Sequence, residues 1–584
     1  MAGSCWDSCP SGWPITSSFR LPPPASGRGR SSTSTVIFSR RPRRRSLSRQ
    51  GTKPVIPLII IIVYLGVLLW LSRFAHISFS RHTAGDYFVA SRTIGPFLLI
   101  MSVFGTTMTA FALVGSTGEA FTHGIGVYGL MASWSGLVHS ACFFLIGVKL
   151  WSYGNRFNFT TQIQFFRDRF QSNTLGLILF PVLVGLVIPY LLIGVLASGA
   201  TIEKVTVGAF PSIFAATRGG IPAWLGSGAV CTVVLIYVFG GGVRSTAWAN
   251  ALQTCVFMVL GAVTLVLIAH KLGGAEAATR RVAELRPDLL VRGSVDGHPA
   301  HIGHLQFLSY LFVPLSVAMF PHLFQHWMTA RSARTFRATV ILHPVFIMLV
   351  WLPCILVGVW ASTAVWGGKP IVPPDANPNA VLARMVGTLT NDYMTGFLTV
   401  GILAAIMSSL DSQFLAIGSM FTHDIVLHYW GEQRFSDRQR ILLGRCFVLV
   451  IVVVSYLISL ARPGSVFELG VWCFSGFTSL FPLVFAALYW KRTTAAGAIA
   501  SVLTAAVVWC GLFSWSMVTG KDETHLLYGL MPVSLILAAA AAALVAVSLV
   551  TKAPATAVLE RYFPTASPRP VEPLPQSVAQ EVAI

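Results

Sequence analysis

The chain has 584 residues, of which 54% are hydrophobic and only 11% are charged. Soluble domains carry about 25% charged residues, so this composition excludes an ordinary soluble protein and predicts an all-α polytopic membrane protein. The nine cysteines contain no C-x-x-C pair, which argues against a disulfide framework and against a metal site.

The net charge of +20 is concentrated at the N-terminus. Ten of the 41 basic residues precede Pro54, whereas Asp7 is the one acid in that stretch. We interpret residues 1–53 as a basic, disordered tail. A targeting segment or a patch for anionic lipid or nucleic acid is the alternative, and we expect no nucleic-acid partner for the rest of the chain.

Thirteen apolar segments of spanning length follow the tail, each of roughly 20 residues. They lie at about 54–72, 94–118, 124–150, 174–202, 223–241, 247–270, 305–325, 337–362, 394–424, 438–460, 465–488, 495–517 and 527–550. We therefore expect a transmembrane domain at 54–550 and a Pro-rich C-terminal tail at 551–584 that is too short for a domain. No G-x-x-x-x-G-K-S/T motif is present, so we do not expect ATP-driven pumping.

Basic residues gather in alternate connections, at 73–92, 156–169, 244, 331–337 and 491–492. We expect the protein in the plasma membrane. The positive-inside rule then predicts that the N-terminus lies outside and that the C-terminus lies in the cytoplasm. The basic tail contradicts this orientation, because ten cations before the first span favour an inside N-terminus.

Two of the predicted spans are interrupted. The span at 94–118 carries Gly95, Pro96 and Gly105 beside a polar run at 106–109, and the span at 305–325 carries Pro314 and Pro321. Broken spans at corresponding places in two halves are typical of secondary transporters. They suggest two inverted repeats of five helices, at about 94–270 and 305–488, although Gly and Pro are also common in membrane helices.

A polar notch at 404–413 interrupts the apolar run from about 395 to 416. In a helix, Ala405, Ser408 and Ser409 are spaced i, i+3 and i+4 and share one face, where two hydroxyls and a carbonyl offer oxygen ligands to a monovalent cation. Close helix packing by small residues is the alternative.

The motifs together resemble one family, the sodium/solute symporters. The matching stretches are Gly85–Arg92, Gly240–Gln253, Pro321–Arg331, the notch with Asp424 and Ile425 after it, and Gly476–Arg492. The resemblance implies two inverted five-helix repeats, a carrier that is not an enzyme, Na⁺ as coupling ion and no organic cofactor. It also implies a sodium site made by the carbonyls of Gly105, Met108 and Ala405 and the hydroxyls of Ser408 and Ser409.

The same resemblance suggests where the solute binds. The expected pocket residues are Thr106, Thr107, Phe111, Val317, Pro321 and Trp472. The family commonly carries Asp where this chain has Asn250, which favours a single coupled sodium. Proline carriers of the family carry Asp at the position of Thr107 and aromatics at those of Val313 and Val317, so proline itself is in doubt.

Two polar residues within the spans have open roles. Asp411 either tunes the ion site, lines the inner exit or pairs with a basic loop residue, and His322 is expected to hydrogen-bond to the broken helix. The sequence as a whole predicts sodium-coupled symport of a small organic solute by alternating access. A transporter-like sensor that binds solute without turnover and a proton-coupled carrier are the alternatives, and a passive channel lacks any filter-like motif.

Overall fold

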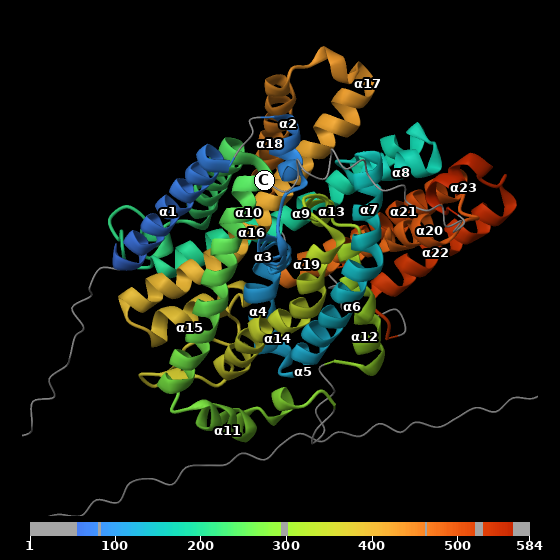
Figure 1. The fold of residues 1–584 in the computed structure, drawn as a ribbon. Coiled ribbons are helices and arrows are strands. Elements are labelled where there is room, and N and C mark those ends of the chain that lie inside the picture. Colours follow the sequence, from blue (N-terminus) through green and yellow to red (C-terminus); the bar gives the residue numbers. More distant parts are fainter. Residues whose placement is uncertain (1–54, 80–82, 294–301, 462–463, 520–528, 565–584) are drawn as a thin grey trace, which may run out of the picture. The chain divides into compact units, whose positions relative to one another are not determined.

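The computed structural model describes residues 55–79, 83–293, 302–461, 464–519 and 529–564. The predicted N-terminal tail and most of the predicted C-terminal tail lie outside these residues. Within them the chain is almost entirely helical (Figure 1). This confirms the all-α fold class.

Ten helices in the described residues are long and apolar enough to cross a membrane. Eight of them are each built on one long helix: α1 Val55–Phe79, α9 Asn173–Val205, α10 Ala223–Lys271, α14 Phe336–Ala361, α16 Asp392–Met420, α18 Asp437–Leu460, α21 Ala495–Thr519 and α22 Pro532–Val550. The other two are composed of α5 Gly126–Tyr128, α6 Trp134–Cys142 and α7 Val148–Phe157, and of α19 Val466–Ser479 and α20 Phe481–Tyr489.

Both predicted interruptions are present as bends. Helix α3 Pro96–Thr107 meets the segment Phe111–His123, which ends in α4 Ser116–His123, at 55°. The segment His304–Ala318, formed by α12 His304–Ser309 and a 3-10 helix, meets α13 Pro321–Met328 at 50°. Pro321 is the first residue of α13. The N–H at that position has no partner within a helix, so a proline there costs no hydrogen bond.

Counting each bent pair as one span gives up to 12 spans in the described part, not 13. The difference lies in α10, whose 49 residues contain the two predicted spans 223–241 and 247–270. At about 1.5 Å per residue this helix is far longer than a bilayer is thick. Gly242, with φ 61° and ψ −160°, breaks it between the two predicted spans. The count of thirteen therefore stays a prediction.

The remaining elements are short. They are α2 Ala84–Val89, α8 Gln162–Phe170, α11 Ala275–Leu285, α15 Val381–Leu389, α17 His428–Trp430, α23 Thr556–Tyr562 and a two-residue antiparallel hairpin of β1 Val365–Trp366 and β2 Lys369–Pro370. Helix α23 belongs to the stretch 551–584 that the sequence analysis assigned to a Pro-rich C-terminal tail.

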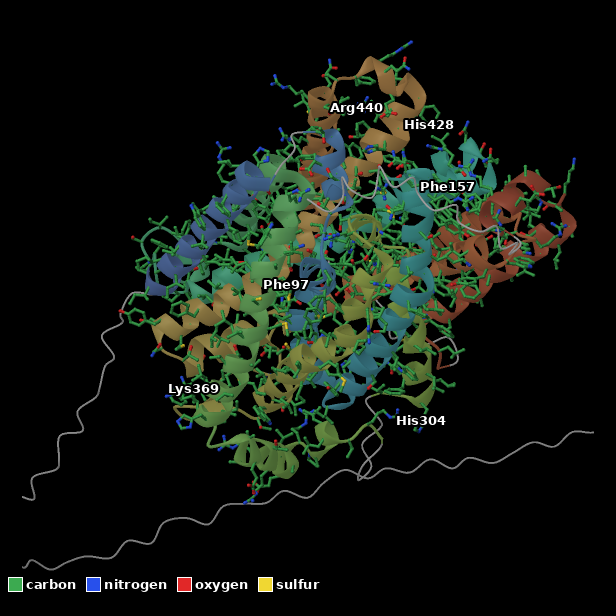
Figure 2. The ribbon with its side chains drawn as sticks, viewed as in Figure 1. Phe97, Phe157, His304, Lys369, His428 and Arg440 are labelled. Carbon is green, nitrogen blue, oxygen red and sulfur yellow. The ribbon has the colours of Figure 1, made fainter. Side chains whose placement is uncertain are left out.

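Helix α16 lies at the centre of the bundle, against α1, α3, α9 and α10 (Figure 1). Its 18-residue apolar window is 83% buried, whereas that of α1 is 28% buried. Figure 2 shows Arg440 and His428 at one end of the bundle, and Lys369 and His304 at the other. The notch therefore stands inside protein and away from lipid, as polar groups in a membrane require.

Several of the basic connections meet at the end that carries Arg440. Arg244 forms an ion pair of 2.6 Å with Asp86, which is 2% exposed, and also donates to the carbonyl of Ala90. Arg92 donates to the carbonyl of Phe159 at 2.8 Å. These contacts place the connections around 86–92, 159 and 244 on one face of the bundle.

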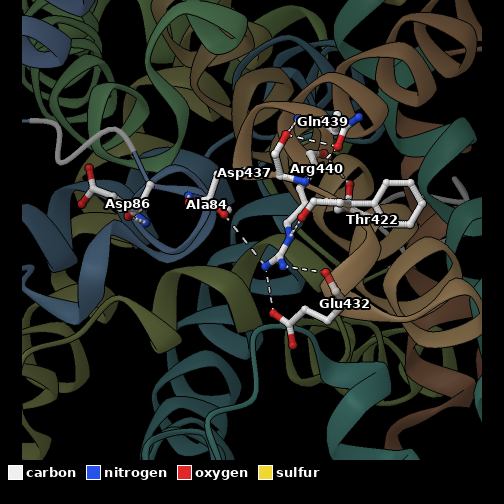
Figure 3. Close-up of polar contacts among 10 residues, drawn as sticks. Ala84, Asp86, Thr422, Glu432, Asp437, Gln439 and Arg440 are labelled. Carbon is white, nitrogen blue, oxygen red and sulfur yellow. Dashed lines mark hydrogen bonds and ion pairs between the residues drawn. The ribbon is translucent and has the colours of Figure 1, made fainter.

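Helix α2 is held to the same face by the start of α18. The backbone N–H of Ala84 donates to the carboxylate of Asp437 at 3.2 Å, and Arg440 pairs with Glu432 at 2.8 Å beside it (Figure 3). Charged groups therefore join the connection before the first broken span to the connection that follows α16.

Candidate functional site

The notch and the first helix break meet in the protein core. Ser408 on α16 donates its hydroxyl to the carbonyl of Gly105 on α3 at 2.8 Å and lies 3.0 Å from the carbonyl of Ala405. A Cβ on Gly105 would collide with the hydroxyl of Thr254, so glycine is required for this close approach. Three of the five predicted sodium ligands therefore converge on one point.

The other two predicted ligands lie beside this point. Ser409 is 2% exposed and donates to the carbonyl of Ile406 at 3.0 Å. Met108 is the residue at which α3 ends, with a non-helical φ of −88° and ψ of 81°. Because Met108 leaves the helical path, its carbonyl does not continue the regular ladder of α3.

Two threonines precede the break and behave differently. The hydroxyl of Thr106 is buried and has no hydrogen-bond partner in the described residues. Thr107 turns its hydroxyl back to the carbonyls of Val103 and Phe104, at 3.1 and 2.9 Å. An unpaired buried hydroxyl costs about 1–3 kcal/mol, so Thr106 is a further oxygen that a ligand at the break would satisfy.

The donor set fits a sodium ion. The atoms that converge are carbonyl and hydroxyl oxygens, which hard cations prefer, and Ser408 can turn its lone pairs to a cation while the Gly105 and Ala405 carbonyls face the same point. Among the described residues no cluster of three or more His, Cys, Asp or Glu side chains could hold a metal ion of another kind.

A small cavity of about 30 Å³ adjoins the break. Met108, Thr107 and Phe111 form one wall, and Val313 and Val317 form another. The expected pocket residues Thr107, Phe111 and Val317 thus come together, and they share the cavity with a predicted sodium ligand. Most of the remaining wall is aromatic: Tyr190, Tyr310, Phe320, Trp351 and Phe474.

Three other expected residues do not line this cavity. Thr106 is fully buried in α3, and Pro321 begins α13. Trp472 packs on Phe513 with ring centroids 5.4 Å apart, and its carbonyl accepts from Trp509. Trp472 therefore faces α21, which the sequence pattern of α19 alone did not indicate.

His322 has surroundings that differ from the expectation. Its ring stacks on that of Phe320 at 5.1 Å, and neither of its ring nitrogens has a hydrogen-bond partner in the described residues. The expected bond to the broken helix is not formed.

Asp411 belongs to a polar network that the sequence did not predict. Its carboxylate accepts from the hydroxyl of Tyr237 at 2.8 Å and from that of Ser412 at 3.0 Å. The Ser412 hydroxyl also contacts the Asn250 amide and His326, each at 3.0 Å. None of these partners is a basic loop residue, so that alternative is wrong.

Asn250 and Asp411 belong to the same network, because both contact the hydroxyl of Ser412. A buried tyrosine 174 residues away from Asp411 carries no signal in the local sequence, although an acid inside an apolar run is itself a functional indication.

Comparisons with known proteins identify relatives along most of the chain. The chain is 26% identical over 509 residues to the osmoregulated proline transporter OpuE of Bacillus subtilis, covering 85% of this chain and 96% of that protein. It is 26% identical over 515 residues to a sodium/proline symporter of Haemophilus influenzae, covering 86% of this chain and 96% of the relative.

The fold is similar to that of a solved Na⁺-coupled sialic acid symporter in a substrate-bound outward-open state. The TM-score is 0.66 at 16% identity, and the match covers 85% of this chain and 98% of that one. The family model of the sodium:solute symporter family matches residues 87–505. The chain belongs to the sodium:solute symporter family, whose members are secondary transporters embedded in a membrane and not enzymes.

Proposed function

We propose that this protein couples the entry of Na⁺ to the uptake of a small organic solute by alternating access. The observation that carries the proposal is the contact of 2.8 Å between the Ser408 hydroxyl and the Gly105 carbonyl. It joins the first helix of one repeat to the central helix of the other at the point where α3 breaks. A cation bound there holds the two repeats together, and Met108 links it to the solute cavity.

The driving force is sufficient for concentrative transport. A tenfold sodium gradient contributes about 1.4 kcal/mol, and a membrane potential of about 100 mV adds about 2.3 kcal/mol per charge. One sodium ion then supports several hundredfold accumulation of a neutral solute.

We infer an orientation in the plasma membrane with the C-terminal segment on the cytoplasmic side. Helix α23 docks on α8, where Arg561 pairs with Asp168 at 3.0 Å and Tyr562 donates to the same carboxylate. The C-terminal segment therefore lies near the basic connection at 156–169. The positive-inside rule assigns that side to the cytoplasm.

Uptake into proteoliposomes tests the function. We expect solute uptake that rises with an inward sodium gradient, rises further with an inside-negative potential and disappears when external sodium is replaced by choline. Uptake that is unchanged by this replacement contradicts sodium coupling, and solute binding without uptake identifies a sensor.

Asp411 favours a proton-coupled carrier as the second candidate, because it is fully buried and its carboxylate accepts hydrogen bonds from the uncharged hydroxyls of Tyr237 and Ser412. Uptake driven by an inward proton gradient in the absence of sodium would support this candidate.

A further inference from the structure

Two buried histidines stand beside the solute cavity. His139 on α6 lines the cavity, and its Nδ1 lies 3.1 Å from Nε2 of His343 on α14. The two residues are 7% and 0% exposed. Neither was singled out in the sequence, where they are 204 positions apart.

The surroundings of His343 indicate which ring is the donor in the hydrogen bond between the two histidines. Nδ1 of His343 is buried and has no hydrogen-bond partner in the described residues, and the ring packs at right angles to those of Phe104 and Phe143. Orphaned buried N–H groups are rarer than under-satisfied acceptors. We therefore place the hydrogen of neutral His343 on Nε2, which donates it to Nδ1 of His139.

This assignment gives His139 a free donor. A neutral imidazole whose Nδ1 accepts a hydrogen bond carries its own hydrogen on Nε2. No hydrogen bond within the described part of the chain engages Nε2 of His139 or the hydroxyl of Ser135. Both residues lie on the cavity wall, one helical turn apart on α6, so they present two donors side by side.

The rest of the wall restricts what the donors can bind. None of the described residues on this wall is Asp, Glu, Lys or Arg, so no fixed charge pairs with a charged ammonium group. Met108, a proposed sodium ligand, lies on the same wall. An anionic acceptor would therefore have two neutral donors and a sodium ion nearby, while the aromatic rings of Phe111 and Phe474, 4.9 Å apart, contact its apolar part.

We propose that the solute of this carrier is a small monocarboxylate whose carboxylate accepts hydrogen bonds from Nε2 of His139 and the hydroxyl of Ser135. The inference rests on the proposed sodium-coupled function. The cavity is small, about 30 Å³, which favours an acid of only a few carbon atoms.

Binding and uptake are measured separately on the full chain. Binding of propionate is followed by thermal shift in detergent with sodium present, with propan-1-ol and L-proline as comparison solutes. Uptake of labelled propionate is followed in proteoliposomes. The variants are His139→Phe, which removes the donor but keeps a ring, His139→Gln, which keeps an N–H, and Ser135→Ala. Ser140→Ala is the matched control, because Ser140 lies on α6 but donates to the carbonyl of Val340.

We expect His139→Phe to raise the propionate concentration for half-maximal binding and uptake at least tenfold, which is about 1.4 kcal/mol. His139→Gln restores part of the loss, Ser135→Ala weakens binding, and Ser140→Ala leaves it unchanged. A merely structural role of His139 would not change the preference for propionate over propan-1-ol, whereas loss of the donor reduces that preference.

Three results overturn the inference. The first is sodium-driven uptake of L-proline that excess propionate does not inhibit. The second is equal propionate affinity of His139→Phe and the unaltered protein, and the third is that His139→Phe and Ser140→Ala weaken propionate binding equally. The first of these leaves sodium symport intact. Propionate binding that needs His139 but leads to no uptake would instead support the inference and overturn the proposed function.

Discussion

Replacing Ser408 by alanine separates the stability of the fold from the affinity for sodium. The hydroxyl lies 2.8 Å from the Gly105 carbonyl and 3.0 Å from the Ala405 carbonyl. An ordinary hydrogen bond contributes about 0.5–1.5 kcal/mol to stability, so Ser408→Ala should fold with a small loss. A bond to a charged group is worth about 1.5–3 kcal/mol. At about 1.4 kcal/mol per tenfold, the sodium concentration for half-maximal uptake should rise roughly 10- to 150-fold.

Initial uptake rates against sodium concentration measure this shift, and thermal unfolding measures the stability. Ser501→Ala is the control, because Ser501 is also buried, at 1% exposed, and also donates to a carbonyl on another helix. It lies on α21 and bonds to Ala540 on α22 at 3.0 Å, and it is not among the predicted sodium ligands. The reasoning is refuted if Ser408→Ala keeps the sodium dependence of the unaltered protein, or if both variants shift it equally.

Three further substitutions test contacts at the end of the bundle that carries Arg440. Asp86→Ala should lower stability by about 1.5–3 kcal/mol, because Arg244, whose side chain is 14% exposed, then loses a charged hydrogen-bond partner. The double variant with Arg244→Ala should recover part of the loss, and additive losses in thermal unfolding would show that the pair is not coupled. Gly242→Ala should reduce stability by about 1–3 kcal/mol, since the positive φ of Gly242 suits only glycine and the new Cβ would lie 2.6 Å from the Tyr87 carbonyl. An unchanged unfolding temperature would exclude this strain. Asp168→Asn weakens both polar contacts to α23, so amide hydrogen exchange across α23 should become faster, and equal exchange rates would mean that other contacts hold it.

Interruptions of the helices were predictable because they depend on local backbone chemistry. Pro321 has no N–H, and Gly105 has no side chain, so each marks its place in the sequence whatever surrounds it. Both bends are found where the sequence placed them. The family was also predictable, because the motifs that indicate it are short stretches of consecutive residues.

The partners of buried side chains were not predictable in the same way. Trp472 faces Trp509 and Phe513 on α21, although its position in α19 is equally compatible with the solute cavity. Asp411 was expected to tune the ion site, to line the inner exit or to pair with a basic loop residue. Its carboxylate accepts a hydrogen bond from Tyr237, a partner that the position of Asp411 in α16 does not indicate. A helical pattern determines which residues share a face, but not which helix that face meets.

The sequence by itself determines that this protein spans a membrane, breaks two of its helices and places hydroxyls within an apolar span, because composition, proline and spacing act locally. The tertiary fold determines which of these groups meet. Ser408 reaches Gly105 across 303 residues, and His139 reaches His343 across 204. Contacts over such separations arise from the packing of whole helices, so the oxygen cluster and the histidine pair exist only once α3, α6, α14 and α16 are assembled.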